Sequence, residues 1–399
     1  MGLSLKKWFK VENIHREISA KNKLNLNFYL AINNMKKILR LVFKVEQIIK
    51  NFFFSFLYRK KIFCIVENAP WVIKEEGLNI ARELSNNHRI KFINSITHYG
   101  IFNSVIHYGS INTFITNKNK VKLPSKTNKL VLTCYHFTDD DRRIKLIKAF
   151  QNKVKFFHTA SSLTKGELFK NGIDENKISV IPLGINTDRF YKFKNDIIIK
   201  TKKEFNIPRD SIVIGSFQKD GNGWGEGNSP KLIKGPDIFC DVVEGLSKKY
   251  KIFILLTGPA RGYVKNRLKE KGIPYFHNYL KSIDNLPLYY NLLDLYIVTS
   301  RIEGGPKSIL ESMACGVPVV STRVGMAIDV IQNNNNGILV DVEDVKGLIE
   351  SSDFVLQNAN LRQKLILNGF STVNKYDYKI ISEKYYEEIY SKLFILGSI

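Results

Sequence analysis

The feature that most constrains the fold of this chain is a repeated alternation of short apolar segments with amphipathic helical ones. Residues 61–184 contain strand candidates such as KIFCIVE and KISVIPLG, separated by helical patterns. After a loop at about 186–209 the alternation restarts and continues from residue 211 to residue 340. Strands that alternate with helices predict parallel sheets with right-handed crossovers. Two such series predict an α/β chain with two Rossmann-like domains that face a cleft.

The alternation also divides the chain into segments. Strand candidates are 61–67, 91–94, 112–116, 129–137, 156–161 and 177–184 in the first half, then 211–217, 251–258, 294–300, 317–322 and 337–340 in the second. The expected parts are a basic helical extension (1–60), a first Rossmann-like domain (61–190), a second (208–370) and a C-terminal helix (371–399). The C-terminal helix is expected to pack back on the first domain. Ligands of open α/β sheets bind at the carboxyl ends of the strands, so chemistry is expected in the loops that follow them.

The chain is strongly basic, with 61 Lys and Arg residues against 37 Asp and Glu and a net charge of +24. Such an excess attracts phosphate-bearing partners, which include nucleic acid, anionic lipid and phosphorylated ligands. Lysines spread evenly over the whole surface would give the same net charge. The hydrophobic content of 44% excludes a wholly disordered or low-complexity chain.

The first 61 residues carry much of this excess, with fourteen Lys or Arg against three Glu. Within residues 38–56 an apolar, phenylalanine-rich stripe recurs at helical spacing, and basic residues fall on the opposite face. A basic amphipathic helix of this kind is typical of segments that lie in a membrane interface. A helix that packs on the protein's own core has the same pattern, so both alternatives stay open.

Targeting and redox features predict an intracellular protein. Residues 1–18 lack the apolar core and cleavage site of a signal peptide, and no run of apolar residues is long enough to predict a membrane span. Four widely spaced cysteines, Cys64, Cys134, Cys240 and Cys315, are expected to be reduced and buried. We therefore expect a cytoplasmic protein, peripheral on the cytoplasmic membrane face if the 38–56 helix binds lipid.

Residues 299–325 are the most informative for chemistry. A strand ends, a loop carries Glu303 and two glycines, and Pro306 suits the first turn of a helix. Glycines let a ligand approach the backbone, and the N–H groups of a helix start favour phosphate oxygens. Glu311 follows Glu303 by eight residues, and carboxylates accept paired hydrogen bonds from vicinal diols. A carboxylate on each side of an anion site suits a ligand in which a diphosphate links a sugar to a ribose.

Three motifs give the chain a resemblance to a known family. EGGPKSILE (303–311), followed by SMACGVPVV, resembles the E-x7-E signature of GT-B glycosyltransferases, in particular family 4 of the retaining enzymes. IPLGINTDRF (181–190) is similar to that family's domain junction, and LIKGPDIF (232–239) is similar to the K-G-x-D motif that opens its second domain. The resemblance covers residues 61 to about 390. It implies the GT-B fold and the transfer of a sugar from a nucleotide-diphosphate sugar, with retention and without a bound metal.

The resemblance also implies roles for individual residues. Glu303 is expected to hold the hydroxyl groups of the donor sugar, Glu311 those of the ribose, and Lys234 the diphosphate. His136, which follows a strand of the first domain, is expected to contact the donor sugar near the reacting carbon; otherwise it is a capping or core histidine. His136 and Glu303 are thus the catalytic candidates. The donor-binding candidates are Lys219, Lys234, Gly304, Gly305, Lys307, Ser308 and Glu311.

The chain departs from the family pattern in several places, one of which is Asp329, where a glutamate is usual. After the first strand of the second domain, where the family usually has an arginine, it has GSFQKDGNGWGEG (215–227), so that Lys219 supplies a point charge instead of a bidentate fork. The glycines around Trp224 predict a flexible flap. Near residues 70–80 the chain has only Gly77 where relatives often carry two glycines, so the phosphate or acceptor contact of the first domain stays open.

Other chemistries find little support in the sequence. Asp139, Asp140 and Asp141 resemble a metal-binding D-x-D motif, but after Thr138 they fit better the acidic first turn of a helix that the threonine caps. No metal and no cofactor are therefore expected, and the nucleotide sugar is a co-substrate.

The expected function is sugar transfer to a glycan or lipid-linked acceptor in cell-surface polysaccharide or glycoconjugate synthesis. The expected partners are the nucleotide-sugar donor, that acceptor and, through residues 38–56, an anionic membrane surface, with no specific nucleic acid. Three alternatives stay open: a non-catalytic adaptor that binds nucleotide sugar, a GT-B epimerase, and a protein that binds nucleic acid through its net charge.

Overall fold

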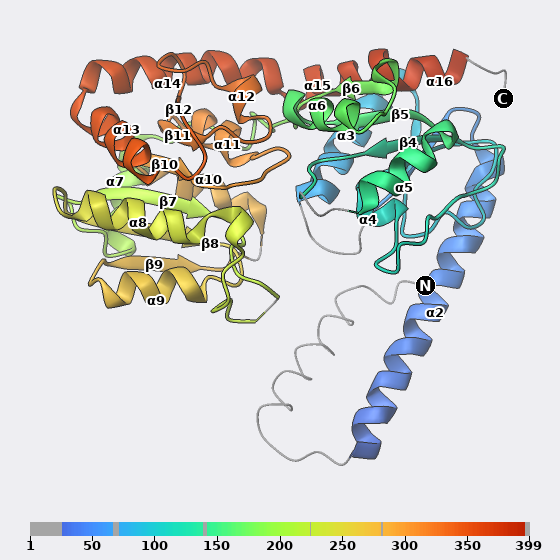
Figure 1. Cartoon of the computed structure of the whole chain (residues 1–399), viewed down its shortest axis with the longest axis horizontal. Coiled ribbons are helices and arrows are strands. Elements are labelled where there is room, and N and C mark those ends of the chain that lie inside the picture. The colour runs from blue at the N-terminus through green and yellow to red at the C-terminus, as the bar shows by residue number, and fades with distance from the viewer. Residues whose placement is uncertain (1–25, 67–71, 139–141, 224, 281, 396–399) are drawn as a thin grey trace.

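The computed structural model describes residues 26–66, 72–138, 142–223, 225–280 and 282–395. Two parallel six-stranded sheets, each covered by helices, form two domains that lie side by side (Figure 1). The predicted pair of Rossmann-like domains is therefore confirmed.

The strands of the first sheet are β1 (Lys61–Ile65), β2 (Lys91–Ser95), β3 (Val105–Tyr108), β4 (Lys129–Thr133), β5 (Val154–Thr159) and β6 (Ile178–Val180). Its helices are α3 (Val72–His88), α4 (Ile111–Phe114), α5 (Arg143–Ala149) and α6 (Ser162–Lys170). The strand order is β2-β1-β3-β4-β5-β6, with all neighbours parallel. The order reverses between β1 and β3, which places a crevice at the carboxyl ends of these two strands.

The prediction of a strand at residues 112–116 was wrong, because the chain forms the short helix α4 there. Ser110 and Thr113 make a reciprocal capping box: the Thr113 N–H donates to Ser110 Oγ at 3.3 Å, and the Ser110 N–H donates to Thr113 Oγ1 at 3.2 Å. Ile111 and Phe114, three residues apart, are both buried. The strand of this region is β3, whose VIHY sequence was not predicted because a histidine interrupts its apolar run.

The strands of the second sheet are β7 (Ile212–Phe217), β8 (Ile252–Thr257), β9 (Tyr275–Asn278), β10 (Leu295–Val298), β11 (Val319–Thr322) and β12 (Ile338–Val340). Its helices are α8 (Pro236–Ser247), α9 (Gly262–Glu270), α10 (Leu286–Asn291), α11 (Ser308–Ala314), α12 (Ala327–Val330), α13 (Val345–Gln357) and α14 (Ala359–Val373). The order β12-β11-β10-β7-β8-β9 reverses between β7 and β10. The predicted loop at 186–209 also contains a helix, α7 (Asn195–Glu204).

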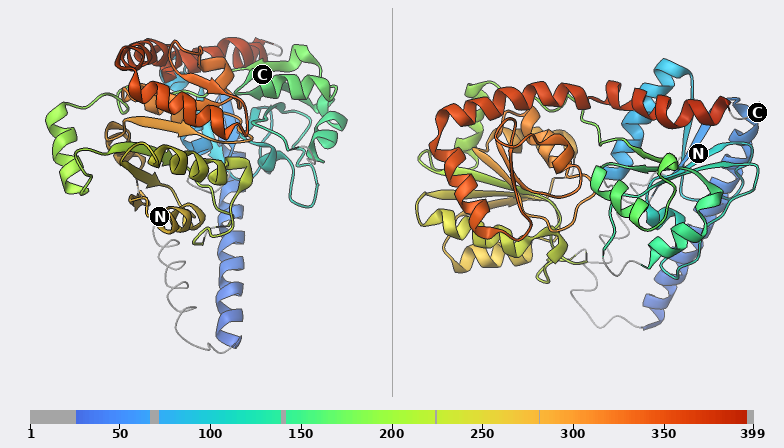
Figure 2. Two further views of the ribbon diagram at one scale, coloured as in Figure 1. Left: turned by 60° about the vertical axis from the view of Figure 1, so that its left-hand side comes forward. Right: turned by 45° about the horizontal axis from the view of Figure 1, so that its top comes forward.

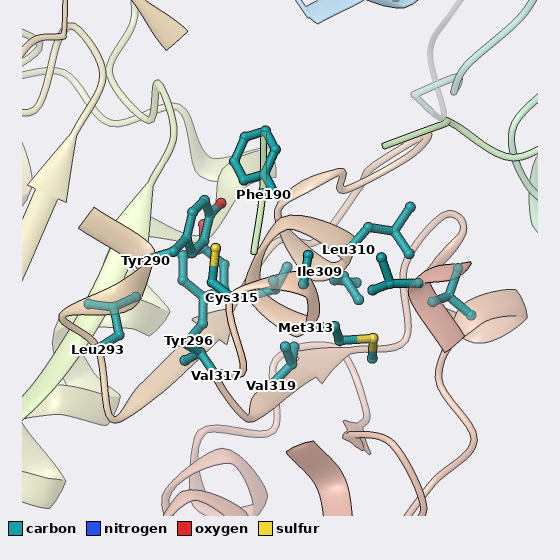
Figure 3. Packing of buried hydrophobic residues seen from close by; sticks show 14 of the residues in the cluster. Phe190, Tyr290, Leu293, Tyr296, Ile309, Leu310, Met313, Cys315, Val317 and Val319 are labelled. Carbon is teal, nitrogen blue, oxygen red and sulfur yellow. The ribbon is translucent and has the colours of Figure 1, made fainter. Parts of the chain in front are cut away.

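A hydrophobic cluster surrounds α11 and fixes its position (Figure 3). Ile309 and Leu310 from the helix are completely buried, and Tyr290 and Tyr296 belong to the same cluster. Burial of a side chain of this size stabilises a fold by about 1.5–3 kcal/mol. The segment that carries Glu311 is therefore held in place by its packing on a buried core.

The C-terminal segment passes from the second domain to the first (Figure 2). After α14 it forms α15 (Tyr378–Tyr385), a π-helical turn (Tyr386–Tyr390) and α16 (Ser391–Ile395). Tyr378, Ile381 and Tyr385 share a buried cluster with Ile62 and Ile80 of the first domain. This last segment thus belongs structurally to the first domain, although it follows the second in sequence.

The helix α2 (Leu26–Leu57) projects away from the first domain (Figure 1). Its buried residues between 32 and 57 are Gln47, Asn51 and Ser55, which recur every four residues. Asn51 Nδ2 lies 3.0 Å from the carbonyl oxygen of Thr97, and the Phe102 N–H donates to Ser55 Oγ at 3.3 Å. The helix is therefore attached to the domain through a polar stripe.

The face of α2 opposite this stripe is apolar and exposed. The exposed large apolar residues are Met35, Ile38, Leu39, Leu41, Val42, Val45, Ile49, Phe52, Phe53, Phe56 and Leu57. Of the two alternatives left open for this helix, packing on the protein's own core occurs only near its C-terminal end: Phe54 packs against the core of the first domain, and Phe52 and Phe56 contact the Phe102 ring. In the described part of the chain, no helix combines the length and the apolar character needed to cross a bilayer.

Candidate active site

The candidate active site is centred on an ion pair between Glu303 and Lys234, in the loops beyond the carboxyl ends of the second sheet. Lys234 Nζ lies 2.5 Å from Glu303 Oε1, to which Ser300 Oγ also donates at 3.1 Å. Burial acts to raise the pKa of Glu303, but the charge and hydrogen bond of Lys234 outweigh it and hold the pKa below its ordinary value. The carboxylate is therefore ionised and accepts hydrogen bonds from hydroxyl groups.

Two contacts hold Lys234 against the loop that carries Glu303. Lys234 precedes Gly235, which begins α8 in the left-handed conformation with a φ of 61°. The Arg301 guanidinium forms a bidentate pair with Asp237 at 2.9 and 2.7 Å, and the backbone N–H of Arg301 donates to the carbonyl of Ile233 at 2.9 Å. Asp237 of the K-G-x-D motif therefore joins the two segments that supply the ion pair.

His136 approaches this pair from the first domain, in the loop after β4. Its Nδ1 is buried and finds no hydrogen-bond partner within the described residues. Burial, followed by the charge of Lys234, lowers the pKa of His136, with Glu303 opposing. The ring is therefore neutral at pH 7. A buried nitrogen without a partner costs about 1–3 kcal/mol, which a ligand that hydrogen-bonds to it would recover.

Gly304 and Gly305 bring the two domains into contact. A Cβ on Gly304 would lie 2.5 Å from the carbonyl oxygen of Tyr135, and one on Gly305 would lie 2.8 Å from Leu183 Cδ1. The expected close approach of a backbone therefore occurs, but in this structure the approaching backbone is that of the first domain. It places His136, the residue after Tyr135, next to Glu303.

Glu311 lies in α11, eight residues beyond Glu303, and is buried. The Tyr290 hydroxyl donates to Glu311 Oε2 at 2.8 Å. Burial raises the pKa of Glu311, while the charge of Lys307 opposes the rise. Ser308, the first residue of α11, bonds through its side chain to the Tyr296 hydroxyl. Ser308 therefore supports α11 from the core side.

Lys307 does not face the Glu303–Lys234 pair. Its Nζ lies 2.6 Å from the Tyr378 hydroxyl and 3.6 Å from Glu76 Oε2. Both partners belong to the far side of the domain boundary, in α15 and α3. The prediction that Lys307 binds the donor finds no support in this arrangement, because its ammonium is occupied by the first domain.

Two further lysines lie near Lys234. Burial lowers the pKa of Lys219, and it lowers that of Lys231 together with the charges of Lys234 and Lys219. The Lys231 N–H donates to the Asp220 carbonyl at 2.7 Å, which brings residue 231 beside residues 219–220. Sequence reasoning missed Lys231, although its spacing of three from Lys234 placed both on one helical turn.

Arg261 is a second residue that sequence reasoning missed. It is 1% exposed, and its Nε lies 3.1 Å from Asp220 Oδ1. The Gly262 N–H donates to the carbonyl of Glu226 at 2.6 Å. The glycine-rich loop predicted to be a flexible flap is therefore fastened at its described residues, while Trp224 lies outside them.

The expectation that the acidic run after Thr138 forms the first turn of a helix instead of a metal site is not tested. Asp139, Asp140 and Asp141 lie beyond the described residues. Within those residues, no three His, Cys, Asp or Glu side chains are grouped as a metal site requires. The four cysteines are buried, as predicted.

Comparison with known families identifies the second domain directly. Residues 230–372, which carry Lys231, Lys234, Glu303 and Glu311, match the family described as glycosyl transferases group 1. The predicted resemblance to glycosyltransferases is therefore confirmed. The match is limited to this segment and leaves the first domain outside it.

Curated relatives that this chain matches are named for glycan synthesis. The chain is 25% identical over 262 residues to the capsular polysaccharide biosynthesis glycosyltransferase CapM of Staphylococcus aureus, which covers 61% of this chain and 66% of the relative. It is 27% identical over 229 residues to the N,N'-diacetylbacillosaminyl-diphospho-undecaprenol alpha-1,3-N-acetylgalactosaminyltransferase of Campylobacter jejuni, covering 56% and 57%. The chain thus spans about half to two thirds of the length of the curated relatives it matches.

Solved structures show the same fold. Anabaena HepE in complex with UDP and glucose matches with a TM-score of 0.67 at 15% identity, over 84% of this chain and all of that one (100%). Sucrose-phosphate synthase from Thermosynechococcus elongatus gives 0.66 at 15% identity, over 85% and 100%. The predicted GT-B fold is confirmed by these likenesses.

Proposed function

We propose that this chain is a glycosyltransferase that moves a sugar from a nucleotide-diphosphate sugar to a glycan or lipid-linked acceptor, with retention, in cell-surface polysaccharide or glycoconjugate synthesis. The observation that carries the proposal is the Glu303–Lys234 pair beside His136, whose buried Nδ1 lacks a partner in the described structure. The names of the Staphylococcus and Campylobacter relatives support this class of acceptor, and the UDP and glucose in the HepE structure support this class of donor.

In the proposed reaction, charge develops on the diphosphate as the bond to the sugar breaks. Lys234, with Lys219 and Lys231 nearby, provides positive charge at that place before the reaction begins. Such preorganised charge stabilises a transition state most effectively in a partly buried site. Glu303 accepts hydrogen bonds from the sugar hydroxyls, and His136 Nδ1 takes the hydrogen bond that it lacks. We propose no metal or further cofactor, since these lysines supply the charge.

We expect one of UDP, GDP, ADP and CDP to bind tightly and Glu311→Gln to weaken that binding about 10- to 100-fold. The reason is that Glu311 would hold the ribose hydroxyls, and a hydrogen bond to a charged group contributes about 1.5–3 kcal/mol. Calorimetric titration of the purified protein with each nucleotide measures both effects.

The matched control for this titration is Glu350→Gln. Glu350 lies on α13, with 67% of its side chain exposed, and pairs only loosely with Lys346 at 3.7 Å. Its substitution should leave the dissociation constant unchanged. Absence of binding to all four nucleotides would contradict the donor site and favour nucleic acid as the partner. Tight binding without turnover would favour the adaptor, and release of nucleotide diphosphate without acceptor would favour the epimerase.

We propose further that the enzyme works peripherally at the cytoplasmic face of a membrane, with residues 38–56 in the interface. The apolar face of α2 is exposed, and the polar stripe of Gln47, Asn51 and Ser55 occupies the side that contacts the protein. Basic residues Lys36, Lys37, Arg40, Lys44 and Lys50 accompany one acidic residue, Glu46, between 32 and 57. This combination of apolar area and positive charge suits an anionic bilayer surface, where lipid-linked acceptors are found.

We expect the protein to bind vesicles that contain anionic lipid and the triple variant Leu41→Ser, Val45→Ser, Phe56→Ser to bind at least about tenfold more weakly. Each apolar side chain withdrawn from water contributes about 1.5–3 kcal/mol. Vesicle co-sedimentation at physiological salt measures the binding.

Exposed apolar residues elsewhere provide the control for this measurement. Phe169, Phe354 and Leu367 are 58%, 53% and 54% exposed and lie away from α2. Their replacement by serine should leave vesicle binding intact. A wild-type protein that stays unbound would contradict the membrane proposal, and a wild-type dimer that the α2 variant abolishes would assign the apolar face to a second copy of the chain.

A further inference from the structure

Three side chains from three distant parts of the chain meet in a buried contact at the domain boundary. They are Glu76 of α3, Tyr378 of α15 and Lys307 of the segment between Glu303 and Glu311, and we call them the interdomain clasp. The Lys307 ammonium donates to the Tyr378 hydroxyl at 2.6 Å, and that hydroxyl donates to Glu76 Oε2 at 2.7 Å. Lys307 Nζ also lies 3.6 Å from Glu76 Oε2.

The clasp is almost completely withdrawn from water. Glu76 is 2% exposed, Tyr378 2% and Lys307 6%. The second oxygen of Glu76 accepts the Gly184 N–H at 2.8 Å, where the first domain leads into the second. A buried ammonium without its counter-charge is strongly destabilised, so Lys307 stays in this position only while Glu76 compensates it.

The clasp is connected to the donor segment through Lys307 itself. Lys307 stands four residues after Glu303 and four before Glu311 in sequence, so it lies midway between the two carboxylates assigned to the donor. Its charge acts on both Glu76 and Glu311, and it opposes the rise in pKa that burial gives each carboxyl group. A fixed Lys307 therefore restricts the segment on which both donor carboxylates are carried.

We propose that Glu76 and Tyr378 are positioning residues for the donor site, through which the first domain and the C-terminal segment set the geometry of residues 303–311. The inference rests on the proposed function, because it assigns these residues to the site where nucleotide-diphosphate sugar would bind. Neither residue belongs to the matched family segment 230–372, so the donor site is incomplete without the rest of the chain.

The test compares Glu76→Gln, Tyr378→Phe and Lys307→Met with the wild type. The probe is UDP, or whichever of UDP, GDP, ADP and CDP the wild type binds most tightly. We expect Glu76→Gln and Lys307→Met each to raise the dissociation constant about tenfold. The double variant Glu76→Gln, Lys307→Met should be no weaker than the weaker single variant, because the two residues act through one contact. Tyr378→Phe keeps the ring in its core cluster and removes only the bridging hydroxyl, so it provides a well-folded variant.

A purely structural role would leave a different signature. It would lower the melting temperature while the folded variants kept the nucleotide affinity of the wild type. If the residues position the donor site, Glu76→Gln, Tyr378→Phe and Lys307→Met should each show a higher KM for the donor and an unchanged KM for the acceptor in an assay of sugar transfer. The matched control is Glu383→Gln on α15, whose carboxylate contacts His88 at 2.7 Å in the first domain, away from Lys307.

The outcomes separate this inference from the function on which it rests. Unchanged affinity in folded Glu76→Gln and Tyr378→Phe, with a wild type that binds nucleotide, would overturn the clasp alone. Independent and additive effects of Glu76→Gln and Lys307→Met would overturn it too. A wild type that binds none of the four nucleotides would overturn the proposed function and the clasp together.

Discussion

Replacement of Glu303 by glutamine is expected to lower the rate of sugar transfer by about 100- to 1000-fold, the range seen when one preorganised polar contact to a transition state is removed. The carboxylate lies 2.5 Å from Lys234 Nζ and is held ionised by it, so it has a full negative charge to offer sugar hydroxyls. Glutamine has the same size but no charge and only one accepting oxygen, so it bonds more weakly to sugar hydroxyls and to the lysine. Release of nucleotide diphosphate from the donor, with and without acceptor, measures the rate.

The loss should fall mainly on kcat, because nucleotide affinity depends on Glu311 and the lysines. Glu343→Gln is the matched control: this glutamate is 64% exposed at its side chain and pairs with Arg301 Nε at 2.7 Å behind the site. Its activity should remain within about twofold of the wild type, since exposed ion pairs contribute little. Equal rates for Glu303→Gln and wild type would remove Glu303 from the catalytic candidates.

The parts of the site that sequence could predict are those that lie close together along the chain. Glu303 and Glu311 belong to one segment of nine residues, and Lys234 belongs to a motif directly before a helix. The two sheets were predictable for a related reason, since most of their strands are local apolar runs; β3 and β9 are not, and neither was predicted. β3 was missed because His107 interrupts its run; the buried ring is satisfied by the Tyr390 hydroxyl and Thr133 Oγ1, both at 2.7 Å.

The remaining features depend on residues that only the fold brings together. Tyr378 and Glu76 are 302 residues apart in sequence, and Lys307 and Tyr378 are 71 apart. No local pattern marks such a contact, and Lys307 was therefore assigned to the ligand instead of to the domain boundary. The same limit applied to α2, whose periodicity predicted an apolar face but not the polar stripe of Asn51 and Ser55 that docks it.

The largest expected effect on stability is that of Arg261→Met. The buried guanidinium donates from one nitrogen to the carbonyls of Ser216, Gln218 and Thr257 at 2.7, 2.8 and 3.0 Å, and it pairs with Asp220. Methionine fills similar space but leaves the carbonyls without their donor and a buried carboxylate without its counter-charge. Breaking a buried pair in this way costs about 3–5 kcal/mol. Urea unfolding followed by circular dichroism measures the loss in the second domain.

Two further variants separate the charge of Arg261 from its hydrogen bonds. Adding Asp220→Asn to Arg261→Met removes the uncompensated charge, so part of the lost unfolding free energy should return. The recovery should stay incomplete, because the three carbonyls still lack a donor. Arg267→Met on α9, the helix that Arg261 precedes, is the control, because its partners Asp241 at 2.9 Å and Glu244 at 3.6 Å are 47% and 29% exposed and such pairs contribute at most about 1 kcal/mol. Equal losses of unfolding free energy for Arg261→Met and Arg267→Met would show that the buried arginine stabilises the domain no more than the partly exposed one. A selective loss at Arg261 would instead show that the second domain depends on a buried arginine that joins the ends of β7 and β8 and that no binding motif identifies.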